Sequence, residues 1–469
     1  MKVLLAATNR ERSPYPVAPL GVLCVAAAAR AAGHEVKFLD LGVERKPQKA
    51  LRQALVKDKF GAVAFGIRNL DSSWLFAPRS YFTEVKEFTE TVRQHFAGPL
   101  VLGGTGFSIS PQGWMQRLLP DCGIIGEGEH VFPEVLSRLE TGRSLEGMQG
   151  VLPTAGHDGQ STTPARAIES LAPLPTPAHE LCHYRRYLRR GGFVGVQTKR
   201  GCPFKCAYCI YPKLEGRRYR LRPPEAVVEE VASVAGRSKL RDFFFVDSVF
   251  NDPRDHALAI CRELARRRVP VRWSAFCNPK GFDAELAQAM KAAGCSGAEF
   301  GLDVASDKML AAFNKPFGQE EIRIALQAAH VAGLPMAIYL LFGGPGETWA
   351  DVEETQNFLN SCATANAVFA TVGIRVYEGT PMARIAVRDG QVKPDQDLFE
   401  PAYYLSPELA DGTESKLDRI TRRRAEWTSP ADWRKTVVRW GQKVSVLLNV
   451  RPQWKYIRGY GEHMRRSTL

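Results

Sequence analysis

The sequence alternates short apolar runs with amphipathic stretches, and this pattern limits the folds it can adopt. In the first 140 residues the apolar runs predict strands, and the amphipathic stretches between or after them predict helices. Buried strands that alternate with helices are typical of a doubly wound parallel sheet. We expect strands at residues 2–7, 35–41, 61–67, 99–104 and 122–127. The sequence therefore predicts an α/β fold that begins with a Rossmann-like domain over residues 1–142.

The same alternation returns in the second half of the chain after an interruption. Residues 143–190 lose the pattern and are rich in proline, which predicts an extended linker. We then expect strands at residues 193–198, 242–247, 271–276, 298–303, 336–343 and 371–377. Six strand–helix units predict a partial (β/α)6 barrel over residues 191–385, with its active site at the carboxyl ends of the strands. We expect residues 386–469 to form a mostly helical C-terminal region.

Glycines follow two of the strands predicted for the first domain. The segments "GGTG" (Gly103–Gly106) and "GEGE" (Gly126–Glu129) lie where ligands bind in doubly wound sheets. Glycine lets a ligand approach the backbone closely, although these residues could also simply turn the chain. The first strand is not followed by G-x-G-x-x-G, so a dinucleotide site is disfavoured.

Three cysteines lie within eight residues of the stretch "KRGCPFKCAYCIYP", directly after the first predicted barrel strand. They are Cys202, Cys206 and Cys209. A structural zinc site of four cysteines would need a second C-x₂-C pair, and the sequence has none. Three thiolates can instead hold three irons of a 4Fe–4S cluster and leave the fourth iron open. An open coordination position on a metal is typical of a catalytic centre.

The spacing C-x₃-C-x₂-C, with Tyr208 before the last cysteine, resembles that of the radical S-adenosylmethionine (SAM) enzymes. The resemblance implies that SAM binds the open iron and that one-electron reduction cleaves SAM to a 5′-deoxyadenosyl radical. It makes the three cysteines both metal ligands and catalytic residues, and it places Tyr208 near the cofactor. It also implies an external one-electron reductant such as flavodoxin or ferredoxin.

Further barrel segments resemble the same family. "FGLDVASDKMLAAFNKPF" matches a stretch that usually reads Gly-Ile-Glu-Ser, with Asp303 at the glutamate position. The cofactor contacts implied by the resemblance in the barrel are Tyr208, Asp247, Asp303, Ser306, Lys315, Gly343 and Gly344. A second interpretation of Asp303 and Lys315 is an ion pair that caps the next helix. Arg375 and Tyr377, on the last predicted strand, either face the substrate as catalytic residues or pack structurally.

The first domain together with the barrel resembles the cobalamin-dependent subfamily, over about the first 380 residues. The resemblance implies that the first sheet binds cobalamin. Arg68, Asn69 and Leu70 would lie near the lower face of the corrin. The nucleotide tail would contact Gly103, Gly104, Thr105, Gly126, Glu127 and Gly128. No D-x-H-x-x-G motif offers a histidine to the cobalt. A degenerate domain without cobalamin is the alternative.

The two cofactors together imply methylation of an unactivated carbon. An sp³ carbon has no lone pair and no acidic proton, so hydrogen abstraction is needed before a methyl group can be added, and the cofactors supply that chemistry. Three alternatives stay open: radical cyclisation or rearrangement with the same cofactors, a radical SAM enzyme without cobalamin, and a cobalamin-sensing or light-sensing protein without a cluster.

The positive charge of the chain is concentrated near its end. The net charge is +13, and residues 413–469 contribute +9 of it. A nucleic-acid-binding protein would carry the excess across its body, so we expect no nucleic acid partner. This tail combines basic residues with Trp433, Trp440 and Trp454, and Val437, Trp440, Val444 and Leu447/Leu448 recur at helical spacing. This pattern is typical of a membrane-surface helix, and it favours a lipid or secondary-metabolite substrate. A helix that packs over the barrel explains it equally well.

The compartment is predicted from what the sequence contains. The apolar run at the start is too short for a secretion signal, and the longest apolar segment, residues 17–29, is too short to span a bilayer. Ten scattered cysteines do not form the disulfide framework of a small secreted domain. We therefore expect a cytoplasmic protein, with membrane contact through the tail as a further hypothesis.

Overall fold

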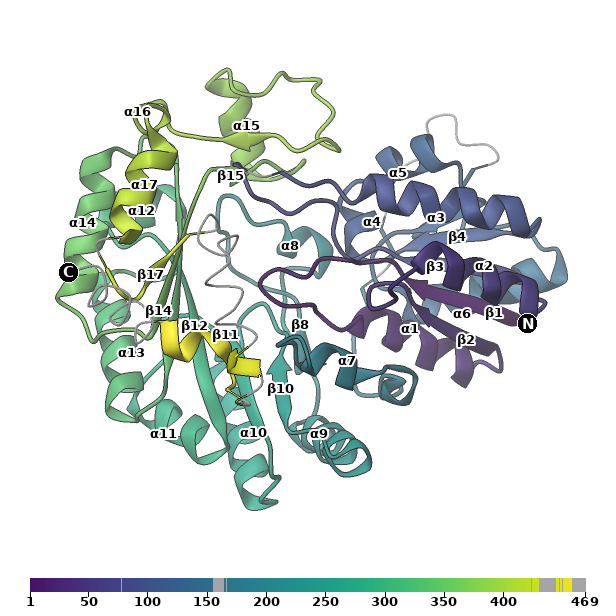
Figure 1. Cartoon of the computed structure of the whole chain (residues 1–469), viewed down its shortest axis with the longest axis horizontal. Coiled ribbons are helices and arrows are strands. Elements are labelled where there is room, and N and C mark those ends of the chain that lie inside the picture. Colours follow the sequence, from purple (N-terminus) through teal and green to yellow (C-terminus); the bar gives the residue numbers. More distant parts are fainter. Residues whose placement is uncertain are drawn as a thin grey trace.

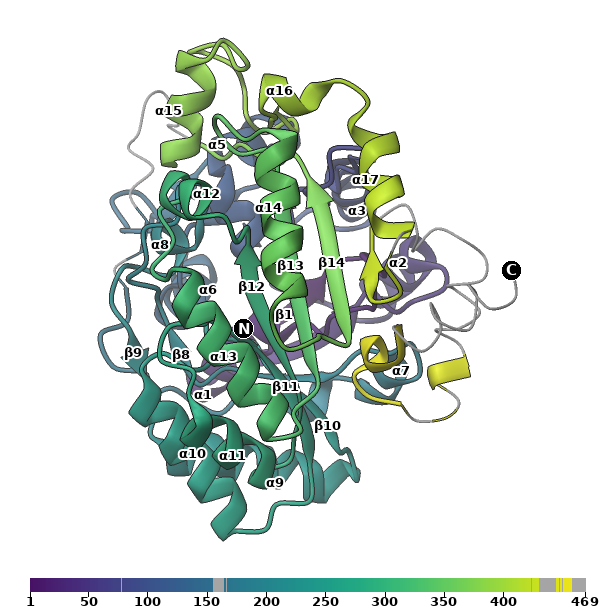
Figure 2. The ribbon, with the colours of Figure 1, turned by 90° about the vertical axis from the view of Figure 1, so that its left-hand side faces the viewer.

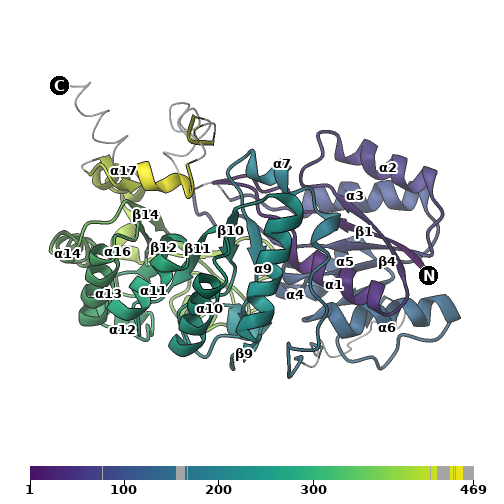
Figure 3. The same cartoon turned by 90° about the horizontal axis from the view of Figure 1, so that it is seen from below.

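The computed structural model describes residues 1–76, 78–154, 164–165, 167–422, 424–429, 444–446, 448 and 450–457. Its frame consists of two mainly parallel sheets in two domains that lie side by side (Figure 1, Figure 3). The first sheet has the order β2 (Glu35–Asp40), β1 (Lys2–Ala7), β3 (Ala62–Gly66), β4 (Leu100–Gly103), β5 (Cys122–Ile124) and β6 (Val151–Pro153). All pairings are parallel except the one between β5 and β6. The predicted Rossmann-like domain is confirmed.

Helices cover both faces of the first sheet because its strands are apolar on both sides. In β1, Leu4 packs toward one face, and Val3 and Leu5 pack toward the other. One face is covered by α2 (Pro47–Lys57), α3 (Phe82–His95) and α5 (Pro111–Leu118), and the other by α1 (Leu20–Ala31) and α6 (Gly128–Thr141). This arrangement leaves the carboxyl ends of the strands as the accessible edge.

The second sheet is the predicted open barrel. Its strand order is β17 (Trp427–Thr428), β14 (Ala367–Val372), β13 (Met336–Phe342), β12 (Cys295–Asp303), β11 (Arg272–Cys277), β10 (Asp242–Phe245) and β7 (Val194–Val196). All of these pairings are parallel. Five long helices connect the strands: α9 (Pro224–Ser238), α10 (Arg254–Arg266), α11 (Ala284–Ala292), α13 (Gln319–Val331) and α14 (Trp349–Asn360). The last three lie on the side away from the first domain (Figure 1, Figure 2).

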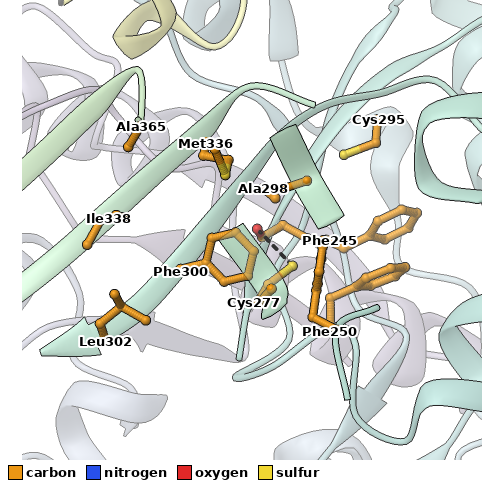
Figure 4. Close-up of a cluster of buried hydrophobic side chains, with 14 of the residues drawn as sticks. Phe245, Phe250, Cys277, Cys295, Ala298, Phe300, Leu302, Met336, Ile338 and Ala365 are labelled. Atoms are coloured by element: carbon orange, nitrogen blue, oxygen red, sulfur yellow. Dashed lines mark hydrogen bonds between the residues drawn. The ribbon is translucent and has the colours of Figure 1, made fainter. Parts of the chain in front are cut away.

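The core of the barrel domain lies between its strands and its helices. Phe245, Phe300 and Ile338 come from three different strands and belong to one buried cluster (Figure 4). Phe300 packs edge-on against Phe282 at a ring distance of 4.9 Å. Alternate residues of the same strands point to the opposite, concave face, where the ligand cavity lies.

Two predicted boundaries differ in the structure. The sixth barrel strand ends at Val372, and the following Ile374–Arg375 forms a separate strand, β15, antiparallel to β16 (Tyr403–Tyr404). Gly373 separates them with φ +85°, a conformation that favours glycine and breaks the strand. The linker is also more structured than predicted, because β6 (Val151–Pro153) completes the first sheet and α7 (Tyr184–Leu188) follows it.

The C-terminal region contains α15 (Pro381–Arg388), α16 (Pro407–Ala410), α17 (Thr413–Arg422) and the short helix η2 (Gln453–Tyr456). Trp433 and Trp440 of the predicted amphipathic helix lie outside the described residues. Trp454 is buried and donates a hydrogen bond to Glu299 inside the barrel, at 3.0 Å. A Cβ at Gly297 would stand 2.6 Å from its indole ring. Trp454 is therefore a core residue, and this part of the membrane hypothesis is wrong.

Candidate functional site

The cysteine segment follows β7 and the short strand β8 (Lys199–Arg200), which pairs with β9 (Arg220–Leu221). Its backbone is held on two sides. The N–H of Cys202 donates to the carbonyl of Gly216 at 3.0 Å, and that of Ala207 donates to Phe313 at 2.9 Å. These contacts fix the loop at the carboxyl end of the barrel, where the sequence places the chemistry.

The three thiols are partly enclosed by the protein: Cys202 is buried, and Cys206 and Cys209 are half-buried. Burial raises the pKa of Cys209 to about 12 and also raises the pKa of Cys202 and Cys206. The charge of Lys315 acts in the opposite direction on Cys206 and Cys209. Binding of iron would stabilise these buried cysteines as thiolates, because the positive metal takes the place of the thiol protons.

Tyr208, Asp303 and Lys315 form one partly buried cluster. The hydroxyl of Tyr208 and the ammonium group of Lys315 both donate to Asp303 Oδ2, the latter at 2.6 Å. Lys315 also donates to the carbonyl of Gly301 at 3.2 Å. Asp303 has φ +67° where β12 shifts its register, so the backbone turns at this point. The ion pair expected from the sequence exists, but it connects to Tyr208 and does not cap a helix.

Asp247 is almost fully buried just after β10. Its Oδ1 accepts the backbone N–H of Thr198 at 2.7 Å and that of Lys199 at 3.2 Å. Its Oδ2 accepts the Thr198 hydroxyl at 2.5 Å and the Lys199 ammonium group at 3.3 Å. Because all these donors come from the chain, Asp247 holds the segment that leads into the cysteine loop.

Three further residues that the sequence assigns to the cofactor, Gly343, Gly344 and Ser306, form hydrogen bonds with other residues of the chain. The backbone N–H groups of Gly343 and Gly344 both donate to Glu347 Oε2, at 2.5 and 2.8 Å. Burial raises the pKa of Glu347 to about 7. Ser306 is fully buried and caps α12 (Asp307–Ala312) by accepting the N–H of Met309 at 3.3 Å. The sequence did not single out Glu347, because its contacts depend on how the loop that carries Gly343 and Gly344 folds around its carboxylate.

Among the described residues, two cavities adjoin the cysteine segment. The first, the glycine cavity, has a volume of about 360 Å³ and lies at the carboxyl ends of β1, β3, β4 and β5. It reaches across to Arg200 and to Tyr211 at the start of α8 (Tyr211–Leu214) in the barrel domain. The cobalamin contacts predicted from the sequence that line it are Arg68, Asn69, Gly103, Gly104, Thr105, Gly126, Glu127 and Gly128.

Two of the residues predicted near cobalamin have other contacts. Leu70 does not line the glycine cavity, because its side chain is 2% exposed in the core of the first domain. Glu127 pairs with Arg220 at 2.7 Å and with Arg200 at 3.3 Å, both from the barrel domain. Burial would raise the pKa of Glu127, but these two arginines lower it. Glu127 therefore joins the domains at the rim of the cavity.

The second cavity, the barrel cavity, has a volume of about 370 Å³ and lies against the concave side of β13 and β14. Tyr208 and Asp303 line it, as do Arg375 and Tyr377. The guanidinium group of Arg375 binds Asp71 of the first domain at 2.8 Å and also donates to the carbonyls of Val376 and Leu398, at 2.5 and 2.8 Å.

Tyr377 is tied to the first domain as well, because its hydroxyl lies 2.9 Å from Ser73 Oγ. Burial raises the pKa of Tyr377 to about 12. Neither residue stands on a barrel strand as predicted. Both lie beyond Gly373, where the chain meets the loop of residues 71–80. The sequence analysis did not predict a role for this loop, because no motif marks it and it contacts residues of the other domain.

Family models match both domains. A model of the B12 binding domain matches residues 8–136, and a model of the radical SAM superfamily matches residues 196–359. The chain belongs to the radical SAM enzymes with a B12-binding domain. The 4Fe–4S cluster, SAM and cobalamin predicted as cofactors are confirmed by this assignment. The three thiols are of the donor type that an iron–sulfur cluster requires, and the glycine cavity lies at the strand ends of the domain that the B12-binding model matches.

Similar proteins include methyltransferases. Tryptophan 2-C-methyltransferase of Streptomyces laurentii is 27% identical over 414 residues, which cover 74% of this chain and 68% of that protein. An uncharacterised methyltransferase of Pyrococcus horikoshii is 27% identical over 394 residues, which cover 82% of this chain and 83% of that protein. The structure of the radical SAM methyltransferase TsrM from Kitasatospora setae matches with a TM-score of 0.85 at 24% identity, over 100% of this chain and 99% of TsrM. That likeness confirms the fold.

The described part of the chain contains no helix of the length and apolar character that crossing a membrane requires.

Proposed function

We propose that this protein is a cobalamin-dependent radical SAM enzyme that methylates a carbon atom of a small molecule. One observation carries the proposal: the cysteine segment lies between two cavities, with Tyr208 in the wall of the barrel cavity and Tyr211 in the wall of the glycine cavity. A group bound to the cysteines would thus be close to a ligand of the barrel and to a ligand of the first domain. The methyltransferase names of the two relatives support methyl transfer.

The residues of the cysteine segment would hold the cluster. Cys202, Cys206 and Cys209 would bind three of its irons as thiolates, and their protons would leave on binding. When bound, the cluster supplies the electron that cleaves SAM, and cobalamin supplies a methyl group to the substrate carbon. An external one-electron donor such as flavodoxin or ferredoxin would reduce the cluster. The backbone hydrogen bonds of the loop to Gly216 and Phe313 would hold these cysteines in position.

The glycine cavity would hold cobalamin. Gly103, Gly104 and Gly126 line this cavity with backbone that carries no side chain. Thr105, Glu127 and Gly128 lie on the same rim, and Arg68 and Asn69 follow β3. We leave Leu70 out of the proposed contacts because it belongs to the core.

SAM would lie on the barrel side of the cysteine segment. Tyr208 and Asp303 line the cavity there, and Lys315 fixes the orientation of the Asp303 carboxylate. We propose that Asp247, Gly343 and Gly344 act by shaping the loops around SAM, since their polar groups bind other parts of the chain. Ser306 would stabilise α12 and make no cofactor contact.

The test is anaerobic reconstitution with iron, sulfide, hydroxocobalamin and SAM carrying a labelled methyl group. We expect bound corrin and iron, 5′-deoxyadenosine after reduction, and label in a product from a size-filtered extract of the source cells. Cys206→Ala should abolish 5′-deoxyadenosine. The matched control is Cys362→Ala, because Cys362 is also half-buried but lies at the end of α14.

The outcomes separate the alternatives. 5′-Deoxyadenosine without transfer of label would favour cyclisation or rearrangement over methylation. Iron without corrin absorbance would favour a degenerate first domain. Unchanged 5′-deoxyadenosine formation by the Cys206 variant would overturn the cluster assignment.

Membrane contact through the tail is a separate part of the proposal, based on Trp433 and Trp440 and the surrounding basic residues. Substitution of both tryptophans by alanine leaves Trp454, which packs against Glu299, in place. We expect the variant to co-sediment less with anionic liposomes than the parent protein. Equal sedimentation of the two proteins would rule the contact out.

A further inference from the structure

The cysteine segment and the hairpin that follows it are strongly basic. Residues 199–222 contain eight lysines and arginines and one acidic residue, Glu215. Four of these cations are paired with carboxylates of the protein: Lys199 with Asp247, Arg200 with Glu129, Arg220 with Glu127 and Arg222 with Glu230. Of the others, Lys213 donates to the carbonyl of Glu378 at 3.4 Å. The ion pairs fix the base of the segment and leave three further cations to be explained.

These three cations stand on the outer surface beside the cysteines. Lys205 lies between the first two cysteines of the segment and is exposed. Arg217 and Arg218 are also exposed, in the turn after α8. The carbonyl of Gly216 in this turn accepts the N–H of Cys202 at 3.0 Å. The turn and its two arginines are therefore held directly against the cysteine segment.

A fourth cation reaches the same place from another part of the barrel domain. Lys280 follows β11 and is exposed, and its ammonium nitrogen lies 5.8 Å from the centre of the Phe204 ring. Phe204 belongs to the cysteine segment, so this cation–π contact places Lys280 beside the same loop. We call Lys205, Arg217, Arg218 and Lys280 the basic patch.

The basic patch keeps its charge. Among the residues that the structure describes, none of its four side chains has an ion pair with a carboxylate. Two carboxylates act on Cys202 through their charge, and both accept hydrogen bonds from the chain. Glu215 accepts the N–H of Gly201 at 3.2 Å. Asp252 accepts the Tyr219 hydroxyl at 2.8 Å.

The position of the basic patch separates it from the two ligand cavities. None of its four residues lines the barrel cavity or the glycine cavity. Its cations are therefore not placed to bind a small molecule in either cavity, and they face solvent around the loop that carries the cysteines. A surface of this kind attracts a macromolecule of opposite charge.

We propose that the basic patch docks an acidic electron-transfer protein, which reduces the cluster through the cysteine loop. This proposal rests on the proposed function, since it names where the external reductant of that enzyme binds. One electron passes from the donor to the cluster, so the donor is oxidised, the cluster is reduced, and no bond forms or breaks. Electron-transfer complexes bury little surface, so a small charged patch without an apolar groove is sufficient.

The test measures how fast the cluster is reduced in protein loaded with iron, sulfide and hydroxocobalamin, by freeze-quench electron paramagnetic resonance. The donors are a reduced acidic flavodoxin and reduced methyl viologen, which is a small cation. The variant Arg217→Glu, Arg218→Glu reverses two charges of the patch. At low salt we expect its rate with flavodoxin to fall at least about tenfold, as the loss of electrostatic steering predicts. Its rate with methyl viologen should rise, because the new carboxylates attract a cation.

Salt provides a second measurement. The Debye length falls from about 10 Å at 0.1 M to about 3 Å at 1 M. The difference between parent and variant with flavodoxin should therefore shrink to less than about threefold at 1 M salt. The matched control is Lys49→Glu, Arg52→Glu, which reverses two exposed charges on α2 at the outer end of the first domain (Figure 1). Both of its rates should stay within about twofold of the parent values.

Three outcomes would overturn the proposal. The first is an equal flavodoxin rate in the parent and the patch variant. The second is failure of flavodoxin to reduce a parent protein that methyl viologen reduces. The third is an equal fall in both rates, because the loss of docking cannot slow a small cation. The proposed function fails separately, if the parent protein reduced by methyl viologen forms no 5′-deoxyadenosine from SAM.

Discussion

Glu299 is a carboxyl group inside the barrel with no exposed surface. It accepts one hydrogen bond from Tyr339 and one from Trp454, and both donors are neutral. Burial raises its pKa from 4.5 to about 7, although these two hydrogen bonds act in the opposite direction. The residue thus holds an aromatic wall of the cavity in place at a cost that depends on pH.

The substitution Glu299→Gln should reveal this cost. The folded protein holds the Glu299 proton up to about pH 7, whereas the unfolded chain releases it near pH 4.5, so the native protein loses stability as pH rises between these values. Relative to the parent, the variant should gain about 2 kcal/mol in its free energy of unfolding between pH 5.5 and pH 8. Denaturant unfolding at both values measures the difference. The exposed Glu225→Gln should show no such change, and an equal difference at both pH values for the Glu299 variant would contradict the expectation.

At the scale of elements, polar residues around the barrel mouth stabilise helix and strand ends, and two of them, Ser306 and Asp247, are residues that the family resemblance assigns to cofactor contacts. Ser306 caps α12, Glu347 binds the glycine loop after β13, and Asp247 fixes the segment after β7. These ends surround the cysteine segment. Correct placement of the ligands therefore depends on how the elements terminate as much as on the ligands themselves.

The substitution Ser306→Ala tests this interpretation. Loss of a helix N-cap typically costs about 1 kcal/mol, and we expect the free energy of unfolding to fall by that amount. SAM affinity of the reconstituted protein should change less than about twofold, because we propose that Ser306 does not contact SAM. This is far below the tenfold change that a loss of about 1.4 kcal/mol in binding free energy would produce. Thr380→Ala removes the cap of α15 and should cost a similar amount. Weakened SAM binding at unchanged stability would instead return Ser306 to the cofactor contacts.

At the scale of the whole molecule, ion pairs join the two domains around both cavities. Asp71 pairs with Arg375 beside the barrel cavity, and Glu127 pairs with Arg200 and Arg220 beside the glycine cavity. All of these side chains are largely buried. The relative position of the domains is therefore fixed by charges that cannot be left unpaired.

Removing one partner should be costly. Asp71→Ala leaves the Arg375 charge buried, and we expect a loss of about 3–5 kcal/mol in the free energy of unfolding. Glu90→Ala, which breaks an exposed pair with Lys86, should cost less than about 1 kcal/mol. The double variant Asp71→Ala, Arg375→Met should recover part of the loss. If the single and double variants were equally destabilised, the buried charge would not be the cause.

The sequence by itself determined the fold class, and it predicts the three cysteines as cluster ligands. Buried strands and helices leave periodic apolar patterns, and metal ligands on one loop keep a fixed spacing. Both can therefore be predicted from residues that lie close together in the sequence. The sixth barrel strand was misplaced because the apolar run continues through Gly373 and only the backbone conformation there ends the strand.

Only the tertiary structure decided what the remaining residues contact. Trp454 reads as part of a basic amphipathic tail, yet it packs inside the barrel against Glu299. Arg375 reads as a substrate residue, yet Asp71, 304 positions away, binds its guanidinium group. The reason is physical: the partner of a polar or aromatic side chain is set by which distant elements the fold brings together, and no local pattern in the sequence records that distance.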